Sequence, residues 1–305
     1  MHRAARRILV FGSNGQVGHE LPIALAGLGD VTSLDRTQGD LSHPESLRAV
    51  VKYHAPDIIV NAAAYTAVDR AESEPDLAHT VNAVAPGVLA EAAQASGACL
   101  VHYSTDYVFD GKSRDAYRET DEAGPLSVYG RSKLLGELAV ARVCQRHVIF
   151  RTSWVFGAHG SNFLKTMLRL AAEREGLRVV ADQFGAPTSA RLIATITGRY
   201  LEEVLEARDQ DAKWGLYHLA SAGEASWYSY ARHIVACGHQ LGMPLRTTPD
   251  SVVPISTAEY PVAGPRPSNS RLDTSNLRAA LEVELPDWRR DVTQTIHELH
   301  SSRPR

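Results

Sequence analysis

The chain has 305 residues, enough for one large domain or two domains with a sizeable core, and its formal net charge is −3. This nearly neutral charge argues against a nucleic-acid partner, and no apolar stretch of the sequence is long enough to cross a membrane. Three dispersed cysteines, one of them inside a predicted strand, indicate reduced thiols and cytoplasmic residence.

The first predicted strand leads directly into a glycine-rich turn. Residues 8–11 form a short apolar run typical of a buried parallel strand, and GSNGQVG follows at 12–18. Glycines permit backbone torsions closed to other residues and let a diphosphate approach the amides at a helix N-terminus. The spacing differs from the general G-x-G-x-x-G fingerprint, and no Lys-Ser/Thr pair follows as in a P-loop. The turn predicts a dinucleotide site at Gly12, Gly15 and Gly18, and a tight turn without ligand is the alternative.

The second predicted strand, at 31–35, ends in an acidic residue about twenty positions after the glycine turn. A carboxylate at Asp35 can accept hydrogen bonds from an adenosine ribose, whereas the guanidinium of Arg36 can hold a ribose 2′-phosphate. The choice between NADH and NADPH is therefore open. Asp40 is a second acid, which can meet an adenine amino group or simply belong to the cap of a helix that begins near Ser42.

Small and hydroxyl-bearing residues follow the third and fourth predicted strands. The third strand, at 57–61, ends in three alanines that suit close passage of a flat ligand, and the fourth, at 98–103, ends in Ser-Thr-Asp. Ligands of open α/β sheets bind outside the carboxyl ends of the strands. We therefore expect Gly15, Ala64 and Thr105 to converge on one crevice.

A tyrosine and a lysine lie four residues apart at the start of the next predicted helix. Tyr129 and Lys133 project from one helix face, so an ammonium can sit beside a phenol. A nearby cation favours the phenolate and lowers the pKa of the phenol from about 10 towards the range of efficient acid–base catalysis. Such a pair can give a proton to a carbonyl that Thr105 also contacts. By itself the spacing is more typical of an ordinary exposed helix pair, and the other motifs of the chain are needed to favour catalysis.

The alternation of strands and helices predicts an α/β fold, a doubly wound, Rossmann-like parallel sheet with a smaller C-terminal lobe. Residues 1–157 are the expected dinucleotide-binding domain, with strands near 8, 31, 57, 98 and 147. Residues 158–305 are expected to be mainly a substrate-binding lobe. Within them, helices are predicted at 162–175, 190–206 and 226–239, and a strand at 177–182 is expected to return to the sheet. Residues 214–220 are placed in the smaller lobe.

Two arginines in a proline-rich loop and one tryptophan are further candidates for substrate contacts. Arg266 and Arg271 can grip a diphosphate, because arginine suits bidentate phosphate binding, or they can be structural. Trp154 follows a predicted strand, and a large indole in that place is more often a packing residue than a platform for a ligand.

The glycine turn, the Asn-Ala-Ala and Ser-Thr-Asp segments and Tyr-x-x-x-Lys occur in the order typical of the extended short-chain dehydrogenase/reductase superfamily. A closer resemblance is to the dTDP-4-dehydrorhamnose reductases, and it runs from about residue 7 to the late 280s. It rests on NAAAYTAVDRAE at 61–72, YSTDYVF at 103–109, RTSWV at 151–155, QFGAPT at 183–188 and RPSNSRL at 266–272.

The resemblance implies the last step of dTDP-L-rhamnose synthesis, in which the C4 ketone of dTDP-4-dehydro-L-rhamnose is reduced with NADPH or NADH. It implies that Tyr129 donates the proton, that Lys133 binds the nicotinamide ribose and lowers the pKa of Tyr129, and that Thr105 polarises the ketone. Besides these and the glycines, it places against the cofactor Gln16, Val17, Asp35, Asp40, Leu41, Ala63, Ala64, Tyr65, Thr66 and Tyr103. The resemblance also implies that Thr105, Asp106 and Trp154 contact the sugar nucleotide. Arg266 is a further candidate for binding its diphosphate.

Two other functions stay open. A sugar-nucleotide epimerase or dehydratase of the same superfamily would share the Tyr-Lys pair but return the hydride within one cycle. A non-catalytic NADP-binding regulatory subunit would share the fold, although the retention of Thr105, Tyr129 and Lys133 argues against it. Net consumption of NAD(P)H separates these functions.

The residues call for no metal, because the 13 histidines are scattered without ligand spacing. Some members of the resembled family have been described with a magnesium ion that bridges a dimer through acidic residues. Glu20 keeps one such position, but Arg191 stands where a partner acid is expected. A homodimer is left open, and a metal-bridged dimer is doubtful.

Overall fold

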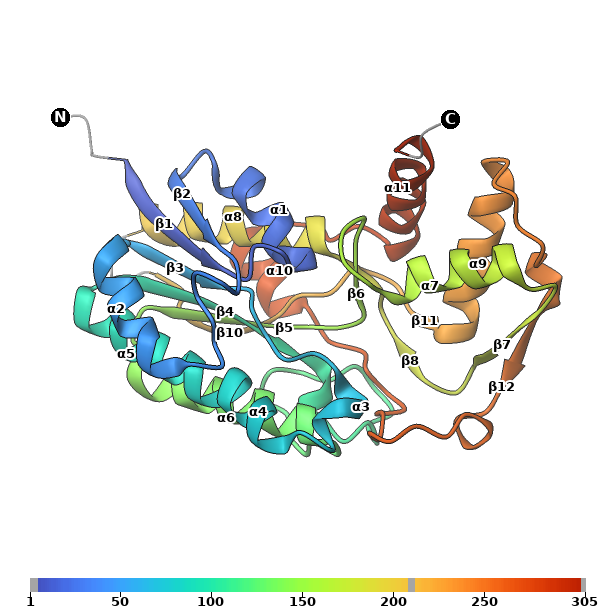
Figure 1. Ribbon diagram of the computed structural model, residues 1–305, viewed down its shortest axis with the longest axis horizontal. Coiled ribbons are helices and arrows are strands. Elements are labelled where there is room, and N and C mark those ends of the chain that lie inside the picture. The colour runs from blue at the N-terminus through green and yellow to red at the C-terminus, as the bar shows by residue number, and fades with distance from the viewer. Residues whose placement is uncertain (1–4, 208–211, 303–305) are drawn as a thin grey trace.

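The computed structural model describes residues 5–207 and 212–302, and its centre is a sheet of six parallel strands (Figure 1). In spatial order the strands are β2 (Gly29–Leu34), β1 (Arg6–Phe11), β3 (Ile58–Asn61), β4 (Cys99–Thr105), β5 (His147–Thr152) and β10 (Gly215–His218). The five strands expected near residues 8, 31, 57, 98 and 147 are confirmed. Because every pair is parallel, the carboxyl ends of all six strands lie at one edge.

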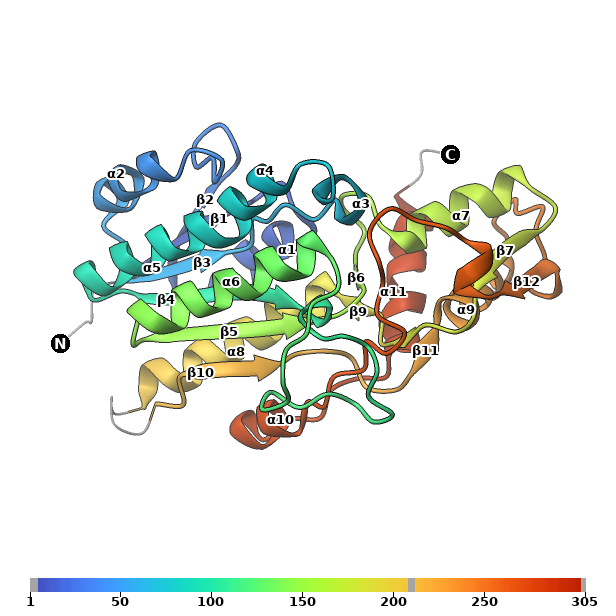
Figure 2. The same ribbon diagram turned by 90° about the horizontal axis from the view of Figure 1, so that it is seen from below.

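Helices cover both faces of this sheet (Figures 1 and 2). One face carries α1 (Gln16–Leu25), α8 (Ala190–Glu206) and α10 (Ser275–Leu281), and the other carries α2 (Pro44–His54), α5 (Ala85–Ser96) and α6 (Val128–Val143). Successive side chains of β1 alternate between the two cores, with Ile8 and Val10 in the first and Leu9 and Phe11 in the second. The predicted doubly wound α/β fold is confirmed.

Short helical segments connect β3 to α5. They are α3 (Val68–Ala71), α4 (Pro75–His79) and the π-helical turn η1 (Thr80–Val84). The side chain of Asn82 in this turn accepts from the amide of Tyr65 at 2.8 Å and donates to its carbonyl at 2.9 Å. The π-helical turn thereby fixes the loop that follows β3. A 3-10 turn, η2 (Asp106–Val108), follows β4.

The second lobe packs around Tyr230 and Trp288, both fully buried. Its helices are α7 (Phe163–Glu173), α9 (Trp227–Gln240) and α11 (Trp288–Ser301). Its strand pairs are β7 (Leu177–Val180) with β12 (Val252–Ile255) and β8 (Phe184–Gly185) with β11 (Ala225–Ser226). The 3-10 turns η3 (Pro249–Ser251) and η4 (Thr257–Glu259) flank β12, and β6 (Val155–Phe156) pairs with β9 (Thr188–Ser189).

Two expectations for the second half of the chain are wrong. The strand at 177–182 does not return to the main sheet, because β7 pairs with β12 and buries Leu177 and Val179 in the second lobe. Residues 214–220 were expected in the smaller lobe, but β10 is the sixth strand of the main sheet, where Tyr217 lies opposite Phe150 of β5. A strand of four residues carries too little pattern to specify its partner.

The expected helices at 162–175, 190–206 and 226–239 are confirmed as α7, α8 and α9. However, α8 packs along α1 on the main sheet rather than in the second lobe. Residues 158–305 therefore contribute to both lobes. No helix within the two described ranges is both long and apolar enough to cross a lipid bilayer.

Candidate active site

A cleft of about 680 Å³ lies at the carboxyl ends of β1, β2, β3 and β4. Sites for small molecules usually measure about 300–1,000 Å³, so the cleft is large enough for an extended ligand. The predicted cofactor residues on its wall are Gly12, Gly15, Gln16, Val17, Asp40, Leu41, Ala63, Ala64, Tyr65, Thr66, Tyr103, Tyr129 and Lys133. The structure thus brings most of the predicted set to one place, and cofactor binding by each residue stays a prediction.

The glycine turn is shaped by close backbone contacts. Gly12 has a φ of +86°, and a Cβ there would lie 2.7 Å from the backbone nitrogen of Ala63. A Cβ at Gly18 would lie 2.0 Å from the carbonyl oxygen of Gly12, so Gly18 serves close packing of α1 and is not part of the cleft wall. Gly15 caps α1 without a side-chain hydrogen bond, which leaves amides at the helix N-terminus available to an anion.

At the end of β2, Arg36 lines the cleft and the neighbouring Asp35 does not. Asp35 is not on the cleft wall, because its Oδ1 accepts from the amide of Thr37 at 2.8 Å and from its hydroxyl at 2.6 Å, and these bonds lower the pKa of Asp35. Arg36 is on the wall, with Nε 3.4 Å from Oδ2 of Asp40. A cation rather than the carboxylate of Asp35 therefore faces the cleft beyond β2.

The predicted Tyr-Lys pair occupies the first turns of α6. Ser127 begins the helix by accepting from the amide of Gly130 at 3.1 Å. Tyr129 and Lys133 are both buried and both line the cleft. The ammonium of Lys133 donates to the carbonyl of Tyr103 at 2.6 Å. Burial lowers the pKa of Lys133 to about 8, and the negative charge of Glu137 opposes that shift.

The expectation that Lys133 lowers the pKa of Tyr129 is wrong for this structure. Burial raises the pKa of Tyr129 to about 12, a hydrogen bond with Thr105 offsets part of this rise, and Asp106 adds to it. The ammonium of Lys133 is held at the carbonyl of Tyr103. Spacing in the sequence placed the two side chains on one helix face, but burial has the larger effect on the phenol.

Thr105 and Asp106 form a buried pair beside Tyr129, and neither lies on the cleft wall, so Gly15 and Ala64 meet there as expected but Thr105 does not. The hydroxyl of Thr105 donates to Oδ1 of Asp106 at 3.0 Å and accepts from the amide of Tyr107 at 3.2 Å. Oδ2 of Asp106 is buried and has no hydrogen-bond partner among the residues described. Burial raises the pKa of Asp106 to about 7, against hydrogen bonds from Ser270 and Thr105 that lower it. A buried oxygen without a partner is a suitable acceptor for a ligand hydroxyl.

Trp154 is not on the cleft wall. Its ring stacks on Trp227 with centroids 3.6 Å apart, and a Cβ at Gly185 would lie 2.7 Å from the indole. These contacts show that the side chain of Trp154 packs against its neighbours, as its residue type suggests. Its φ of +48° is rare for a bulky side chain, and such backbone strain is concentrated at functional sites. Contact with a sugar nucleotide stays a prediction.

Both candidate arginines of the proline-rich loop are engaged by protein groups. Arg266 binds Asp69 of α3 with two hydrogen bonds of 2.7 and 2.9 Å. Arg271 binds Glu224 at 2.7 Å and the carbonyl of Arg114 at 2.6 Å. Arg271 is therefore structural, and Arg266 would have to leave Asp69 before it could bind a diphosphate.

Several residues on the cleft wall were not predicted from the sequence. Ser104 is the penultimate residue of β4 and Thr152 is the last residue of β5, and their buried hydroxyls lack partners among the described residues, so they offer further hydrogen bonds to a ligand. The Ser-Thr-Asp segment signalled the first of them. Other helix and loop residues on the wall had no signal at a strand end, and they include Arg70, Leu77, Val81, Gly160 and Ser161.

Within residues 5–207 and 212–302, no three His, Cys, Asp or Glu side chains are grouped to hold a metal ion. The chemistry on the cleft wall is instead that of a phenol, an amine and hydroxyls beside a helix N-terminus. On a doubly wound sheet, this chemistry and the glycine turn define an oxidoreductase of the short-chain dehydrogenase/reductase class.

Comparison with known proteins narrows this class. A family model described as the RmlD substrate binding domain matches residues 6–301. The dTDP-4-dehydrorhamnose reductase of Burkholderia thailandensis is 50% identical over 296 residues, which cover 97% of this chain and 99% of that protein. The protein of the same name from Escherichia coli K12 is 46% identical over 299 residues, covering 97% and 98%. The chain belongs to the dTDP-4-dehydrorhamnose reductase family.

Solved structures agree with this membership. The crystal structure of dTDP-4-dehydrorhamnose reductase from Bacillus anthracis in complex with NADP is similar, with a TM-score of 0.87 and 34% identity. The alignment covers 96% of this chain and 99% of that one. Both lobes of the chain are therefore shared with the relative.

Proposed function

We propose that the protein reduces the C4 ketone of dTDP-4-dehydro-L-rhamnose to give dTDP-L-rhamnose, with NADPH as the hydride donor. The observation that carries this proposal is the presence of Tyr129 and Lys133 on the wall of the same cleft as the glycine turn. Family membership over nearly the whole chain supports the choice of substrate. The NADP in the Bacillus anthracis relative supports the choice of cofactor.

In this proposal the side chains of the protein hold the cofactor, orient the substrate and donate a proton to it. A reduced nicotinamide bound in the cleft would supply the hydride for C4 of the sugar. Tyr129, whose raised pKa of about 12 keeps it protonated at neutral pH, gives its proton to the C4 oxygen as negative charge develops there. Lys133 binds the nicotinamide ribose, and Thr105, fixed by Asp106, positions the ketone oxygen. Asp106, Trp154 and Arg266 are the proposed contacts to the sugar nucleotide.

Arg36 favours NADPH over NADH. Its side chain lines the cleft beyond β2, where an adenosine ribose would be expected. A guanidinium suits bidentate binding of a phosphate, whereas the carboxylate of Asp35 is already occupied by Thr37. We infer that Arg36 meets the 2′-phosphate.

A direct assay tests the function. Purified protein is supplied with the 4-keto sugar nucleotide and either NADPH or NADH, and the absorbance of the reduced nicotinamide is followed. We expect stoichiometric oxidation of the cofactor, formation of dTDP-L-rhamnose and a lower KM for NADPH. A changed sugar without net oxidation would identify an epimerase or dehydratase. Tight NADPH binding without turnover would identify a regulatory subunit.

Tyr129→Phe tests the proposed proton donor. Because only the acidic proton is removed, kcat should fall by about 10²- to 10⁴-fold, the usual contribution of general acid catalysis, while the Kd for NADPH stays nearly unchanged. Lys133→Ala is the comparison, and it should weaken NADPH binding as well as turnover. Small and equal effects of the two substitutions would contradict the assigned roles.

Cellular location and assembly stay predictions. The three cysteines are buried and unpaired, which supports a reducing compartment such as the cytoplasm. A homodimer is the assembly that the family resemblance suggests, and gel filtration with light scattering would measure it.

A further inference from the structure

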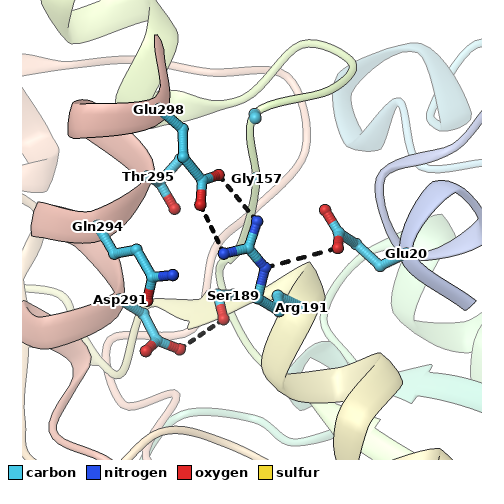
Figure 3. A pocket seen from close by; sticks show the side chains of 9 residues that line it. Glu20, Gly157, Ser189, Arg191, Asp291, Gln294, Thr295 and Glu298 are labelled. Atoms are coloured by element: carbon cyan, nitrogen blue, oxygen red, sulfur yellow. Dashed lines mark hydrogen bonds and ion pairs between the residues drawn. The ribbon is translucent and has the colours of Figure 1, made fainter. Parts of the chain in front are cut away.

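One guanidinium joins three helices in a pocket separate from the cleft. Arg191 is the second residue of α8 and lies between Glu20 of α1 and Glu298 of α11 (Figure 3). Its two terminal nitrogens bind the two oxygens of Glu298 at 2.5 and 2.9 Å. Its Nε lies 3.6 Å from Oε2 of Glu20. The guanidinium of Arg191 therefore forms ion pairs with carboxylates from two other helices.

The cluster depends on this positive charge. The side chain of Glu20 is only 12% exposed, whereas Arg191 and Glu298 are 46% and 34% exposed. Hydrogen bonds with Glu298, supported by the charge of Glu20, raise the pKa of Arg191, and arginine keeps its charge at any practical pH. Without that charge, the largely buried carboxylate of Glu20 would face Glu298 with no cation between them. The nearby carboxylate of Asp291 has a different partner, because its Oδ2 accepts a hydrogen bond from the hydroxyl of Ser189 at 2.5 Å.

The same residues do not fit the magnesium ion described in other members of the family. Magnesium needs oxygen ligands in octahedral geometry at about 2.0–2.1 Å. Here both oxygens of Glu298 are bound by guanidinium nitrogens, and the Nε of Arg191 faces Glu20. A divalent cation cannot approach these carboxylates without displacing Arg191.

The cluster also connects the two lobes. The helices that carry Glu20 and Arg191 pack on the main sheet, whereas α11 contributes Val292 and Ile296 to the core of the second lobe. Gly157, where the chain passes from β6 towards α7, lies beside the cluster (Figure 3). The ion pairs therefore bridge α1 and α8 to α11 at the place where the lobes meet.

We propose that Arg191 is a built-in cation that replaces a divalent metal at the junction of α1, α8 and α11. The contact between the lobes is then independent of magnesium. A carboxylate at position 191 converts the junction into a divalent-cation site, because three carboxylates would replace two carboxylates and a guanidinium. This proposal concerns the junction alone and does not rest on the reductase activity.

Thermal unfolding of the full chain tests the proposal, with magnesium chloride or EDTA as the only variable. We expect the same Tm for the wild type in both. Arg191→Glu should have a lower Tm in EDTA and regain it as magnesium rises, because a ligand that binds only the folded state stabilises it with the logarithm of its concentration. Arg191→Gln should have a lower Tm that does not respond to magnesium.

Arg169→Glu controls for non-specific effects, since Arg169 pairs with a single exposed carboxylate, Glu173. Its Tm should not respond to magnesium. A magnesium-dependent Tm of the wild type, or equal responses of Arg191→Glu and Arg191→Gln, would overturn the proposal. Equilibrium dialysis of the wild type against Mn²⁺ gives a second readout if Arg191→Glu does not fold. Stoichiometric binding by the wild type that Glu298→Gln abolishes would also overturn it, because Glu298 supplies the oxygen ligands at this junction.

Discussion

At the scale of single residues, burial shifts the pKa of three ionisable groups at or near the cleft, Tyr129, Lys133 and Asp106, towards the neutral form. It raises the pKa of Tyr129 to about 12 and that of Asp106 to about 7, and it lowers the pKa of Lys133 to about 8. These shifts all disfavour the charged form, as expected for groups removed from water. A cleft of this kind keeps a proton on its phenol until charge develops on a bound substrate.

Asp106→Asn should change how stability depends on pH. The pKa of Asp106 is about 7 in the folded chain and about 3.9 when unfolded, so between these values the folded state binds more protons. Wild-type stability should therefore fall, through this residue, as pH rises from about 4 to 7. The Tm of the wild type minus that of Asp106→Asn should become more negative over this window. A difference that stays constant or moves the other way would contradict the raised pKa.

The sequence was sufficient to predict most of the positions that meet at the cleft, but Gly18, Asp35 and Thr105 lie off its wall, and the direction of each side chain was not predicted. Tyr129, Lys133 and Gly15 follow from helix spacing and from a turn after a strand, which are local patterns. The ammonium of Lys133 turns to the carbonyl of Tyr103, and Thr37 occupies Asp35. Such partners are set by tertiary contacts and local loop geometry that spacing does not contain.

At the scale of elements, the glycine turn and α1 form one tightly packed unit. Gly18→Ala would place a Cβ 2.0 Å from the carbonyl oxygen of Gly12, so the turn has to move away from the helix. Overpacking of this kind costs about 1–3 kcal/mol. We expect a lower midpoint of urea unfolding and a Kd for NADPH raised by an order of magnitude or more.

Gly27→Ala is the matched control for this substitution. A Cβ at Gly27, just beyond the end of α1, meets no atom within 4 Å. Stability and NADPH binding should both stay close to the wild type. If Gly18→Ala behaved like Gly27→Ala, the close packing of the turn on α1 would not be needed for the site.

Long elements were predicted more reliably than short ones. The helix α8 begins and ends where the sequence pattern placed it, because 17 residues contain enough turns to reveal a buried face. By contrast, β7 and β10 have four residues each. The first was predicted in the main sheet but lies in the second lobe, and the second was predicted in the smaller lobe but lies in the main sheet. Their partners are decided by packing against distant segments, β12 for β7 and β5 for β10.

At the scale of the whole molecule, the two lobes are not consecutive in the chain. The main sheet needs β10, and one of its faces needs α8 and α10, all from beyond residue 157. A fragment of residues 1–157 should therefore expose the apolar face that α8 covers and fail to unfold cooperatively. Calorimetry of the fragment checks this, and co-expression with residues 158–305 should restore a soluble pair. A cooperative transition of the fragment alone would contradict it.

The late return of β10 has a consequence for synthesis on the ribosome. The edge of β5 is complete once residue 152 has emerged, but its neighbour ends only at residue 218. During translation of the intervening segment, an unpaired strand edge and bare apolar side chains are open to contacts between nascent chains. Slow elongation through this interval should raise the demand for chaperones.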